Sequence, residues 1–527
     1  MSKKVLLSFL FSVFILVSCS EDTSFEPEIP QPEISEQLDV IVSSDLRLNP
    51  SGYAPLSARL NFVTGEDVDM QLKVVGKNGV DSDIVKRFNN LGTDFSIPVH
   101  GLYANTLNVL ECTFYDRSGA DLGTQSFTLQ TGTLLGDLPL ITIQEAKLSE
   151  MEPGMTLVSY FGHNGELFPQ RPFIFDSFGD IRWYLDYKSH PRLNQLFYDD
   201  GIGRLANGNF YFGSGGGNFG GSADNAIYEV DLFGQIINTW EMPNYGFHHQ
   251  VKEKPNGNFL VTVNKLGAST IEDHIIEIER DSKEIINVWN LNTSLDNSRR
   301  TLTDDVQDWI HVNAVTYDES DNSIIISGRT QGLIKLTEDN RVVWIIGPHK
   351  DWDMAGDGTD LNQFLLQPLD RNNIPIDELG VRNGDVNHAD FEWNWYQHAP
   401  VLKSNGNIML FDNGDNRNFT GSSTYSRAVE FEVDEASKTI KQIWQYGKER
   451  GGETYSAIVS DVDYLESSDH VLFSPGSITF NGEIYGKSIE VDYASKEVIF
   501  EATITPPTAF FNLITFHRTE RLPLYPE

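Results

Sequence analysis

Hydrophobic and polar residues alternate in short runs along most of the chain, which is the pattern of half-buried β-strands. Between residues 38 and 133, runs such as ARLNFV, MQLKVV and LNVLECTFYD are separated by turns rich in glycine, asparagine and aspartate. Short strands with frequent turns are typical of a small antiparallel sandwich. We therefore predict an N-terminal β-sandwich-like domain over residues 37–135, and we find no candidate chemistry in it.

A longer unit recurs from about residue 154 onward. It consists of a strand, an Asn-Gly-Asn or Asp-Asn-Ser turn, a second strand, and a strand pair that closes on a large apolar residue. The units begin near Met155 and Gly203 and then at HHQVKEKPNGNFLVTV, HVNAVTYDESDNSIIISGR, HAPVLKSNGNIMLFDNG and AIVSDVDYLESSDHVLFS. Units of this kind match propeller blades, whose radial closure leaves no long exposed sheet edge. The sequence thus predicts an all-β protein with a six-bladed β-propeller catalytic domain over residues 136–527.

Three segments stand outside this repeat. The tail FFNLITFHRTERLPLYPE is strand-like and either completes a blade or plugs the ring. The insertions at 353–370 and 381–395 both fall between the fourth and fifth units. Because long insertions on a scaffold tend to shape sites, we expect them to form a wall or lid over the propeller axis.

The first residues indicate export. Lys3 and Lys4 precede an apolar run over 5–17 and the sequence Leu16-Val17-Ser18-Cys19. The run is shorter than the ~20 residues that span a bilayer, so we predict a lipoprotein signal peptide over 1–18, with an ordinary secretion signal as the alternative. A lipid on Cys19 would anchor an exported lipoprotein to a membrane, in the periplasm or at the cell surface. Residues 19–36, rich in Glu, Pro and Ser, are predicted to form a disordered tether.

Charge and cysteine content narrow the functional classes. The formal net charge of -37 and pI near 4.6 disfavour nucleic acid as a partner, because phosphate neutralisation needs excess lysine and arginine. An anionic substrate would need a local cationic pocket. Cys112 would be the lone thiol of the mature protein, and its apolar setting predicts a buried small hydrophobic residue, not a nucleophile.

Three units open their first strand with a histidine: His249, His311 and His398. The first strand of each propeller blade lines the central channel, so these side chains are predicted to converge. Arg329, in the second strand of the His311 unit, adds a cation that needs an anionic partner. Guanidinium and imidazole groups together form a multi-donor cradle for phosphate or sulfate.

Other interpretations of these residues remain open. Each histidine taken alone is more typical of a structural hydrogen-bonded residue. Three histidines could bind zinc, but Arg329 would place a positive charge beside the metal and no carboxylate partner is evident. We therefore expect no metal and no cofactor. His248 precedes His249, and strand alternation predicts that the two point in opposite directions, which leaves open which one faces the site.

At these residues the chain resembles the bacterial arylsulfate sulfotransferases that act without a nucleotide sulfate donor. The resemblance is carried by DWIHVNAVTYDESDNSIIISGR at 308–329, QHAPVLKSNGNIMLFDNGDNR at 397–417 and HHQ at 248–250. It implies that His398 becomes sulfurylated while His249, His311 and Arg329 hold the sulfuryl oxygens. The further contacts that we expect on the substrate are Asn313, His248 and Ser460.

The expected function is sulfuryl transfer from a phenolic sulfate ester to a phenolic acceptor. A covalent histidine intermediate divides the transfer into two steps and predicts ping-pong kinetics. The expected partners are the donor, the acceptor and, through the lipid anchor, a membrane; a second copy of the chain, giving a homodimer, is a further option. Two alternatives remain: a non-catalytic propeller that binds sulfated or phosphorylated ligands, and an aryl sulfatase or phosphatase that uses water as acceptor.

Overall fold

The computed structural model describes residues 37–163, 171–194, 202–214, 225–421, 423–507 and 513–526. The predicted signal peptide, the tether and Cys19 lie outside the described residues. Within the described ranges, no helix has the length and apolar character needed to cross a membrane.

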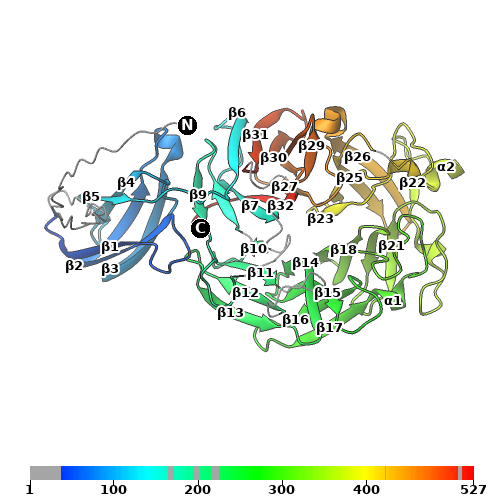
Figure 1. The fold of residues 1–527 in the computed structure, drawn as a ribbon, viewed down its shortest axis with the longest axis horizontal. Coiled ribbons are helices and arrows are strands. Elements are labelled where there is room, and N and C mark those ends of the chain that lie inside the picture. The colour runs from blue at the N-terminus through cyan, green and yellow to red at the C-terminus, as the bar shows by residue number, and fades with distance from the viewer. Residues whose placement is uncertain are drawn as a thin grey trace, which may run out of the picture.

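The N-terminal domain is the predicted β-sandwich, and it lies beside the rim of the second domain (Figure 1). Its strands are β1 (Ile41–Leu48), β2 (Ser57–Val74), β3 (Ile84–His100), β4 (Leu107–Tyr115) and β5 (Asp121–Gln130). The long strand β2 shifts register between Val63 and Val68, so its first half pairs with β1 and its second half with β4. Phe62 and Phe114, from β2 and β4, meet edge to face with ring centroids 5.2 Å apart. Because of this register shift, the two halves of β2 pair with different strands while both contribute side chains to one hydrophobic core.

The described part of the second domain forms six antiparallel sheets around a common centre, consistent with a propeller (Figure 1). One sheet consists of β10 (Ile202–Arg204), β11 (Phe210–Ser214), β12 (Ala226–Val230) and β13 (Ile236–Glu241). The second consists of β14 (Tyr245–Glu253), β15 (Phe259–Lys265), β16 (His274–Ile278) and β17 (Ile285–Asn290). The third consists of β18 (Val312–Asp318), β19 (Ser323–Gly328), β20 (Gly332–Leu336) and β21 (Val342–Ile346). The next contains β23 (His398–Leu402), β24 (Ile408–Asp412), β25 (Arg427–Asp434) and β26 (Thr439–Tyr446), with β22 (Gln367–Leu369) added at its outer edge. The last two are β27 (Asp461–Leu465), β28 (His470–Ser474), β29 (Ile478–Phe480), β30 (Glu483–Asp492) and β31 (Val498–Thr505) with β6 (Leu140–Ala146); and β32 (Leu513–Leu522) with β7 (Met155–His163), β8 (Phe173–Phe175) and β9 (Ile181–Tyr184).

The two ends of the domain close the ring. The C-terminal strand β32 pairs with β7 and becomes the inner strand of the sheet that β7 to β9 complete. The N-terminal strand β6 pairs in turn with β31 of the preceding sheet. The tail therefore completes a blade, and the strand at Met155 is the second strand of its sheet, one position later than the repeat pattern indicated.

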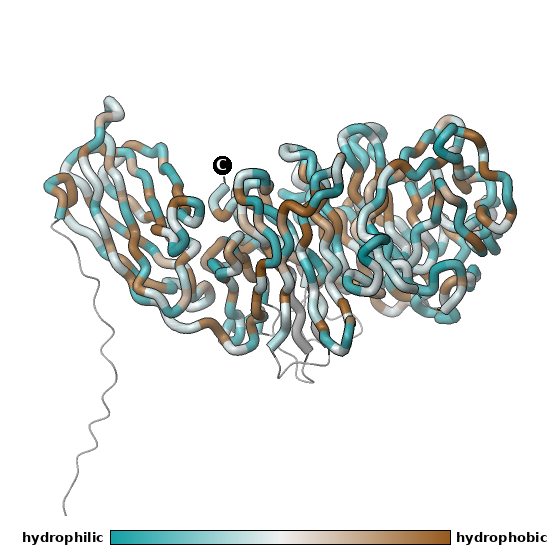
Figure 2. Tube along the Cα trace, turned by 90° about the horizontal axis from the view of Figure 1, so that it is seen from above, coloured by the Kyte–Doolittle hydropathy of each residue, from teal (hydrophilic) through white to brown (hydrophobic). Residues whose placement is uncertain are grey.

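Tryptophans near the ends of the outer strands connect neighbouring sheets. The indole N–H groups of Trp183, Trp240, Trp289 and Trp444 donate to backbone carbonyls of the next sheet at 2.7–2.9 Å, with Trp240 representative at 2.8 Å to Arg280. Trp344 makes the equivalent bond to a side chain of the next sheet, at 2.8 Å. Each ring buries a large apolar area while its one polar atom stays bonded. This explains why the repeat closes on a large aromatic residue, and Figure 2 shows the accompanying alternation of hydrophobic and hydrophilic positions.

The insertion at 353–370 does not form a lid. It contains η2 (Leu361–Phe364) and β22, and β22 pairs in parallel with the outermost strand β26. The insertion therefore covers a sheet edge at the rim of the ring, far from the inner strands. Two other short helices, α1 (Leu291–Ser294) and α2 (Leu379–Arg382), and three further 3-10 turns, η1 (Val80–Ser82), η3 (Arg417–Phe419) and η4 (Lys448–Thr454), complete the elements of the described residues.

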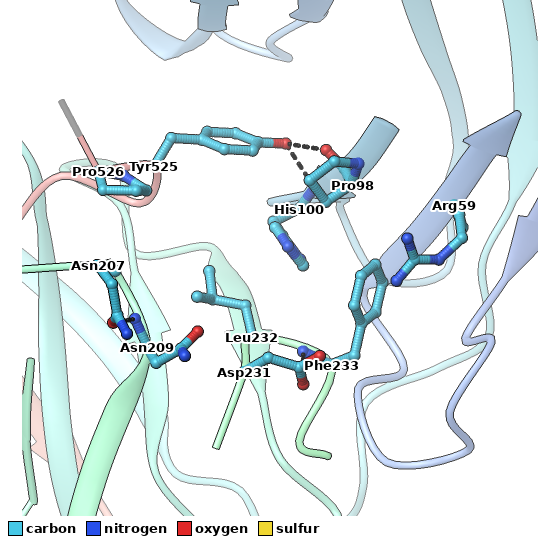
Figure 3. Close-up of a pocket in the computed structure, with 11 residues that line it drawn as sticks. Arg59, Pro98, His100, Asn207, Asn209, Asp231, Leu232, Phe233, Tyr525 and Pro526 are labelled. Carbon is cyan, nitrogen blue, oxygen red and sulfur yellow. Dashed lines mark hydrogen bonds between the residues drawn. The ribbon is translucent and has the colours of Figure 1, made fainter. Parts of the chain in front are cut away.

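The C-terminal residues fasten the sandwich to the propeller (Figure 3). The Tyr525 hydroxyl accepts from the His100 backbone N–H at 2.7 Å and donates to the Pro98 carbonyl at 3.1 Å. A cleft of about 220 Å³ opens beside this contact, with Phe233 and the overlying Arg59 guanidinium on its far wall (Figure 3). Hydrophobic residues of the sandwich and of the adjoining blades form one continuous buried cluster.

Candidate active site

The inner strands of neighbouring sheets are distorted at the same end. Register shifts interrupt the pairing of β14 between Phe247 and Val251, of β18 between Val312 and Ala314, and of β23 between His398 and Val401. Left-handed backbone occurs at non-glycine residues in or just before these strands, with φ of 56° at His249, 52° at His311 and 50° at Ala399, and also before β27, with φ of 88° at Ser460. Bulges redirect side chains, and backbone strain of this kind gathers at functional sites. The repeated distortion brings the predicted histidines together at the propeller axis.

His398 is held in one tautomer. Its Nδ1 lies 2.7 Å from Oδ1 of Asn413, at the end of the neighbouring strand β24. The Asn413 amide is fixed because its Nδ2 donates to the backbone carbonyls of Ser456 and Val459 at 2.8 and 2.9 Å. Oδ1 can then only accept, so Nδ1 of His398 carries the hydrogen. The lone pair of the neutral ring is consequently on Nε2, the atom that must attack if this imidazole is a nucleophile.

The surroundings of His398 keep the ring uncharged. The side chain is buried, and burial lowers its pKa well below the ordinary value, which the neighbouring His249 and Arg329 lower further. The hydrogen bond to Asn413 opposes this shift without reversing it. His398 is therefore uncharged at neutral pH, which is the form in which an imidazole can act as a nucleophile.

His249 and His311 form a pair next to His398. Their Nε2 atoms lie 3.1 Å apart, and the ring of His249 lies 6.2 Å from that of His398 between centroids. Nδ1 of His311 faces two carboxylates, Asp308 at 2.8 Å and Glu272 at 2.5 Å. Burial by itself would lower the pKa of His311, but these carboxylates outweigh burial and raise it to about 9. His311 is therefore an imidazolium at neutral pH and supplies positive charge.

His248 departs from the alternation expected of a regular strand. Its ring lies 4.1 Å from that of His249 between centroids, so both rings are on the same side of the chain. The bulge in β14 and the left-handed backbone of His249 cancel the alternation. His249 takes the position next to His311 and His398, while Nε2 of His248 lies 2.9 Å from Oε2 of Glu272.

Carboxylates stand behind the histidines, contrary to our expectation that none is available. The ligand atoms of His248, His249 and His311 lie within 4.8 Å of one another, as do those of Glu272, Asp308 and His311, so either set could hold a metal ion. The absence of a carboxylate partner therefore no longer argues against a metal. A metal-free site stays a prediction.

Arg329 supplies the second positive charge. Its guanidinium lies 4.9 Å above the ring of Tyr396, and burial lowers its pKa. Its backbone N–H donates to the His311 carbonyl at 3.0 Å, which ties the two residues together. Within the described residues, no hydrogen bond or ion pair of this guanidinium is found. A buried cation without a close counter-ion is unfavourable, and a bound anion would offset that cost.

The two remaining predicted substrate contacts, Asn313 and Ser460, form hydrogen bonds within the protein around the site. Nδ2 of Asn313 donates to the Gln397 carbonyl at 2.9 Å and so holds the backbone that precedes His398. The Ser460 hydroxyl donates to Oγ of Ser456 and accepts from the Gly476 N–H, both at 2.9 Å. Both side chains are buried and engaged in fixing loops around the axis.

Three residues of the site escaped the sequence reasoning. Asn413 lies in FDNGDN, which reads as a simple turn, and Glu272 lies in a loop with no repeat signal. Asp308 stands three residues before His311 and could have been found as a carboxylate beside a candidate histidine. The sequence thus located the imidazoles and the guanidinium but missed the groups that set their protonation.

The fold and the site define a mostly β protein, consistent with a propeller, whose inner strands bring together a cationic cluster and a neutral imidazole. Comparison with known proteins narrows this class. Residues 141–510 match the family Arylsulfotransferase (ASST), and residues 46–132 match the arylsulfotransferase Ig-like domain. The chain therefore belongs to the arylsulfotransferase family, and it is a sulfotransferase enzyme.

Two curated relatives agree with this assignment. Arylsulfate sulfotransferase AssT of Escherichia coli O6:H1 is 28% identical over 87% of this chain and 89% of its own length. AssT of Lelliottia amnigena has the same identity and coverage. Among solved structures, an auxiliary nutrient binding protein from Bacteroides thetaiotaomicron aligns over 93% of this chain and 91% of its own, with 8% identity and a TM-score of 0.28, which is too low to support any argument.

Proposed function

We propose that this protein transfers a sulfuryl group from an aryl sulfate donor to a phenolic acceptor through a sulfohistidine at His398. The observation that supports this best is the pairing of two unsatisfied groups in one place. His398 presents the lone pair of Nε2, and Arg329 presents a guanidinium that lies over the Tyr396 ring and has no hydrogen bond or ion pair with a described residue. A sulfate ester brings an electrophilic sulfur and anionic oxygens, and it satisfies both.

In the first step, Nε2 of His398 attacks sulfur, and the bond between sulfur and the phenolic oxygen breaks. The electron pair of that bond leaves with the phenolate. The ring becomes an N-sulfoimidazolium whose Nδ1–H donates to Asn413, so the hydrogen bond gains strength as charge develops. Arg329, His311 and His249 face the sulfuryl oxygens and compensate their charge.

In the second step, the oxygen of an acceptor phenol attacks the same sulfur and His398 leaves with its lone pair restored. The donor phenol must depart before the acceptor binds, which is the origin of ping-pong kinetics. The phenolic proton is released on acceptance and matches the proton taken up by the first phenolate. No step requires a metal or a cofactor.

The architecture supports the same proposal at a coarser level. The six sheets would be six blades, with the inner strands β14, β18 and β23 supplying the imidazoles. We also propose a lipid on Cys19, which would place the enzyme at a membrane in the periplasm or at the cell surface. Incorporation of labelled palmitate that is lost in Cys19→Ala tests the anchor, and no incorporation in the unaltered protein refutes it.

Incubation with p-nitrophenyl sulfate, with and without phenol, tests the activity. Phenol-dependent release of p-nitrophenol together with phenyl sulfate indicates transfer. Release independent of phenol indicates a sulfatase, and no release indicates a binding protein. Mass spectrometry of a quenched donor-only reaction is expected to find added SO₃ on the peptide of His398, and full activity of His398→Asn would exclude the mechanism.

A further inference from the structure

Glu272 occupies a constrained position between two sheets. It lies in the loop between β15 and β16, is 5% exposed and has a left-handed backbone with φ of 58°. Its N–H donates to Oδ1 of Asn264 at 2.6 Å, and its carbonyl accepts from the Val312 N–H at 3.0 Å. Left-handed backbone is unfavourable for a glutamate, and a buried carboxylate is unfavourable unless it is paired. A residue with both costs calls for an explanation in its side-chain contacts.

The carboxylate bridges two imidazoles from different sheets. Oε2 lies 2.9 Å from Nε2 of His248 and 2.5 Å from Nδ1 of His311. Both are ion-pair distances, so the negative charge of Glu272 lies next to a nitrogen of each ring. With Nδ1 of His311 committed to Glu272 and Asp308, its Nε2 points to His249 and the axial site.

We propose that Glu272 is a positioning residue that keeps His311 charged and aimed at the sulfuryl site. The inference rests on the sulfuryl transfer proposed above and assigns a cause to the positive charge that it uses. Glu272 itself remains ionised, because His248 and His311 hold its pKa well below the ordinary value although burial opposes this. The charged form of His311 also lowers the pKa of His398 and so favours the nucleophilic ring.

Several groups face His311 and enter its titration. They are Glu272 from the β15–β16 loop, Asp308 from the segment before β18, His248 and His249 from β14, Arg329 after β19, and His398 from β23. The two carboxylates favour the imidazolium, and the other four groups oppose it when charged. Removing one carboxylate therefore shifts the titration of His311 downward.

The test compares Glu272→Gln with Glu277→Gln. Glu277 is a matched control: it is also buried, lies in β16, and accepts from Lys254 and Asn258 at 2.9 and 2.8 Å, but belongs to no imidazole cluster. In the unaltered enzyme, kcat/KM for p-nitrophenyl sulfate is expected to fall as pH rises through about 9, the pKa of His311. In Glu272→Gln this fall begins at least one pH unit lower, so kcat/KM drops at least about twofold at pH 8 and at least about fivefold at pH 9, while the difference largely disappears at pH 6.

A titration by histidine NMR separates this proposal from the proposed function. The midpoint of His311 is expected to fall in Glu272→Gln and to stay unchanged in Glu277→Gln, whether or not the protein turns over substrate. An unchanged midpoint, or an unchanged pH profile, in folded Glu272→Gln overturns the role of Glu272. Absence of SO₃ on His398 in the unaltered enzyme instead overturns the proposed function. If Glu272→Gln does not fold, Glu272→Asp, whose shorter side chain moves the carboxylate away from His311, is expected to lower the same midpoint, and an unchanged midpoint in folded Glu272→Asp overturns the proposal.

Discussion

Replacing Asn413 by alanine tests whether the tautomer of His398 controls the reaction. The variant removes the acceptor that holds the hydrogen on Nδ1, so the ring can place its hydrogen on Nε2 and lose its reactive lone pair. It also removes an acceptor whose bond strengthens when the ring becomes sulfurylated and positive. Neither loss changes the imidazole itself.

The expected loss of activity follows from the positive charge that the hydrogen bond between His398 and Asn413 stabilises when the ring is sulfurylated. A hydrogen bond to a charged group contributes about 1.5–3 kcal/mol, and each 1.4 kcal/mol is a factor of ten in rate, so kcat/KM is expected to fall roughly 10- to 150-fold. The variant also leaves the Val459 carbonyl without its donor, which costs about 1–3 kcal/mol of folding free energy. The Ser456 carbonyl keeps a second donor, the Ser426 hydroxyl at 3.2 Å.

The assay is the burst of p-nitrophenol in the absence of acceptor, which reports the first step alone. The control is Asn258→Ala, which removes a comparably buried asparagine, bonded to Glu277 and to the Arg280 N–H, from the opposite end of an inner hairpin. This control is expected to lose stability but to keep the burst rate. A folded Asn413→Ala with the same burst rate as the unaltered enzyme would refute the tautomer argument.

Three further predictions concern the scaffold. Arg427→Ala removes one of the two buried guanidinium groups that pair with Asp412, Arg417 being the other, and is expected to lower the free energy of unfolding in urea by about 1.5–3 kcal/mol, whereas Arg371→Ala, at the surface, changes it little; equal effects would contradict the argument from burial. Tyr525→Phe removes the bonds that fasten the sandwich to the propeller and is expected to cost about 1–3 kcal/mol in the same assay with unchanged sulfuryl transfer, and no loss of stability would contradict it. Burial raises the pKa of the Cys112 thiol to about 12, so peptide mass spectrometry is expected to find Cys112 unalkylated in the native protein at pH 8 and alkylated in urea; native alkylation would show that the thiol is accessible.

The sequence predicted features that repeat and missed features that depend on one contact. His249, His311 and His398 could be found because each stands at the same place in a recurring unit, and a propeller brings such places to one axis. Arg329 could be found because a cation within an apolar strand is conspicuous. Asn413 and Glu272 could not, since each acts through a single tertiary contact and sits in a turn or loop that looks ordinary.

The same distinction explains the errors in the predicted arrangement. The prediction for His248 and His249 assumed a regular strand, and a bulge with one left-handed residue removed the alternation. The first repeat was placed one strand early because ring closure joins β32 to β7, residues far apart in sequence. Local pattern cannot indicate either feature, because both are imposed by the geometry of the closed ring.

The distribution of charge in the site suggests why the missed residues matter. A sulfuryl site needs positive charge to hold its oxygens, yet the nucleophile must remain neutral although it is buried among cations. Different neighbours meet these two demands. The carboxylates of Glu272 and Asp308 lie at Nδ1 of His311 and stabilise its positive charge, whereas the neutral amide oxygen of Asn413 lies at Nδ1 of His398. Exchange of the two kinds of partner would reverse the protonation of both rings. In the proposed mechanism, the residues behind the imidazoles therefore decide which ring holds the oxygens and which one reacts.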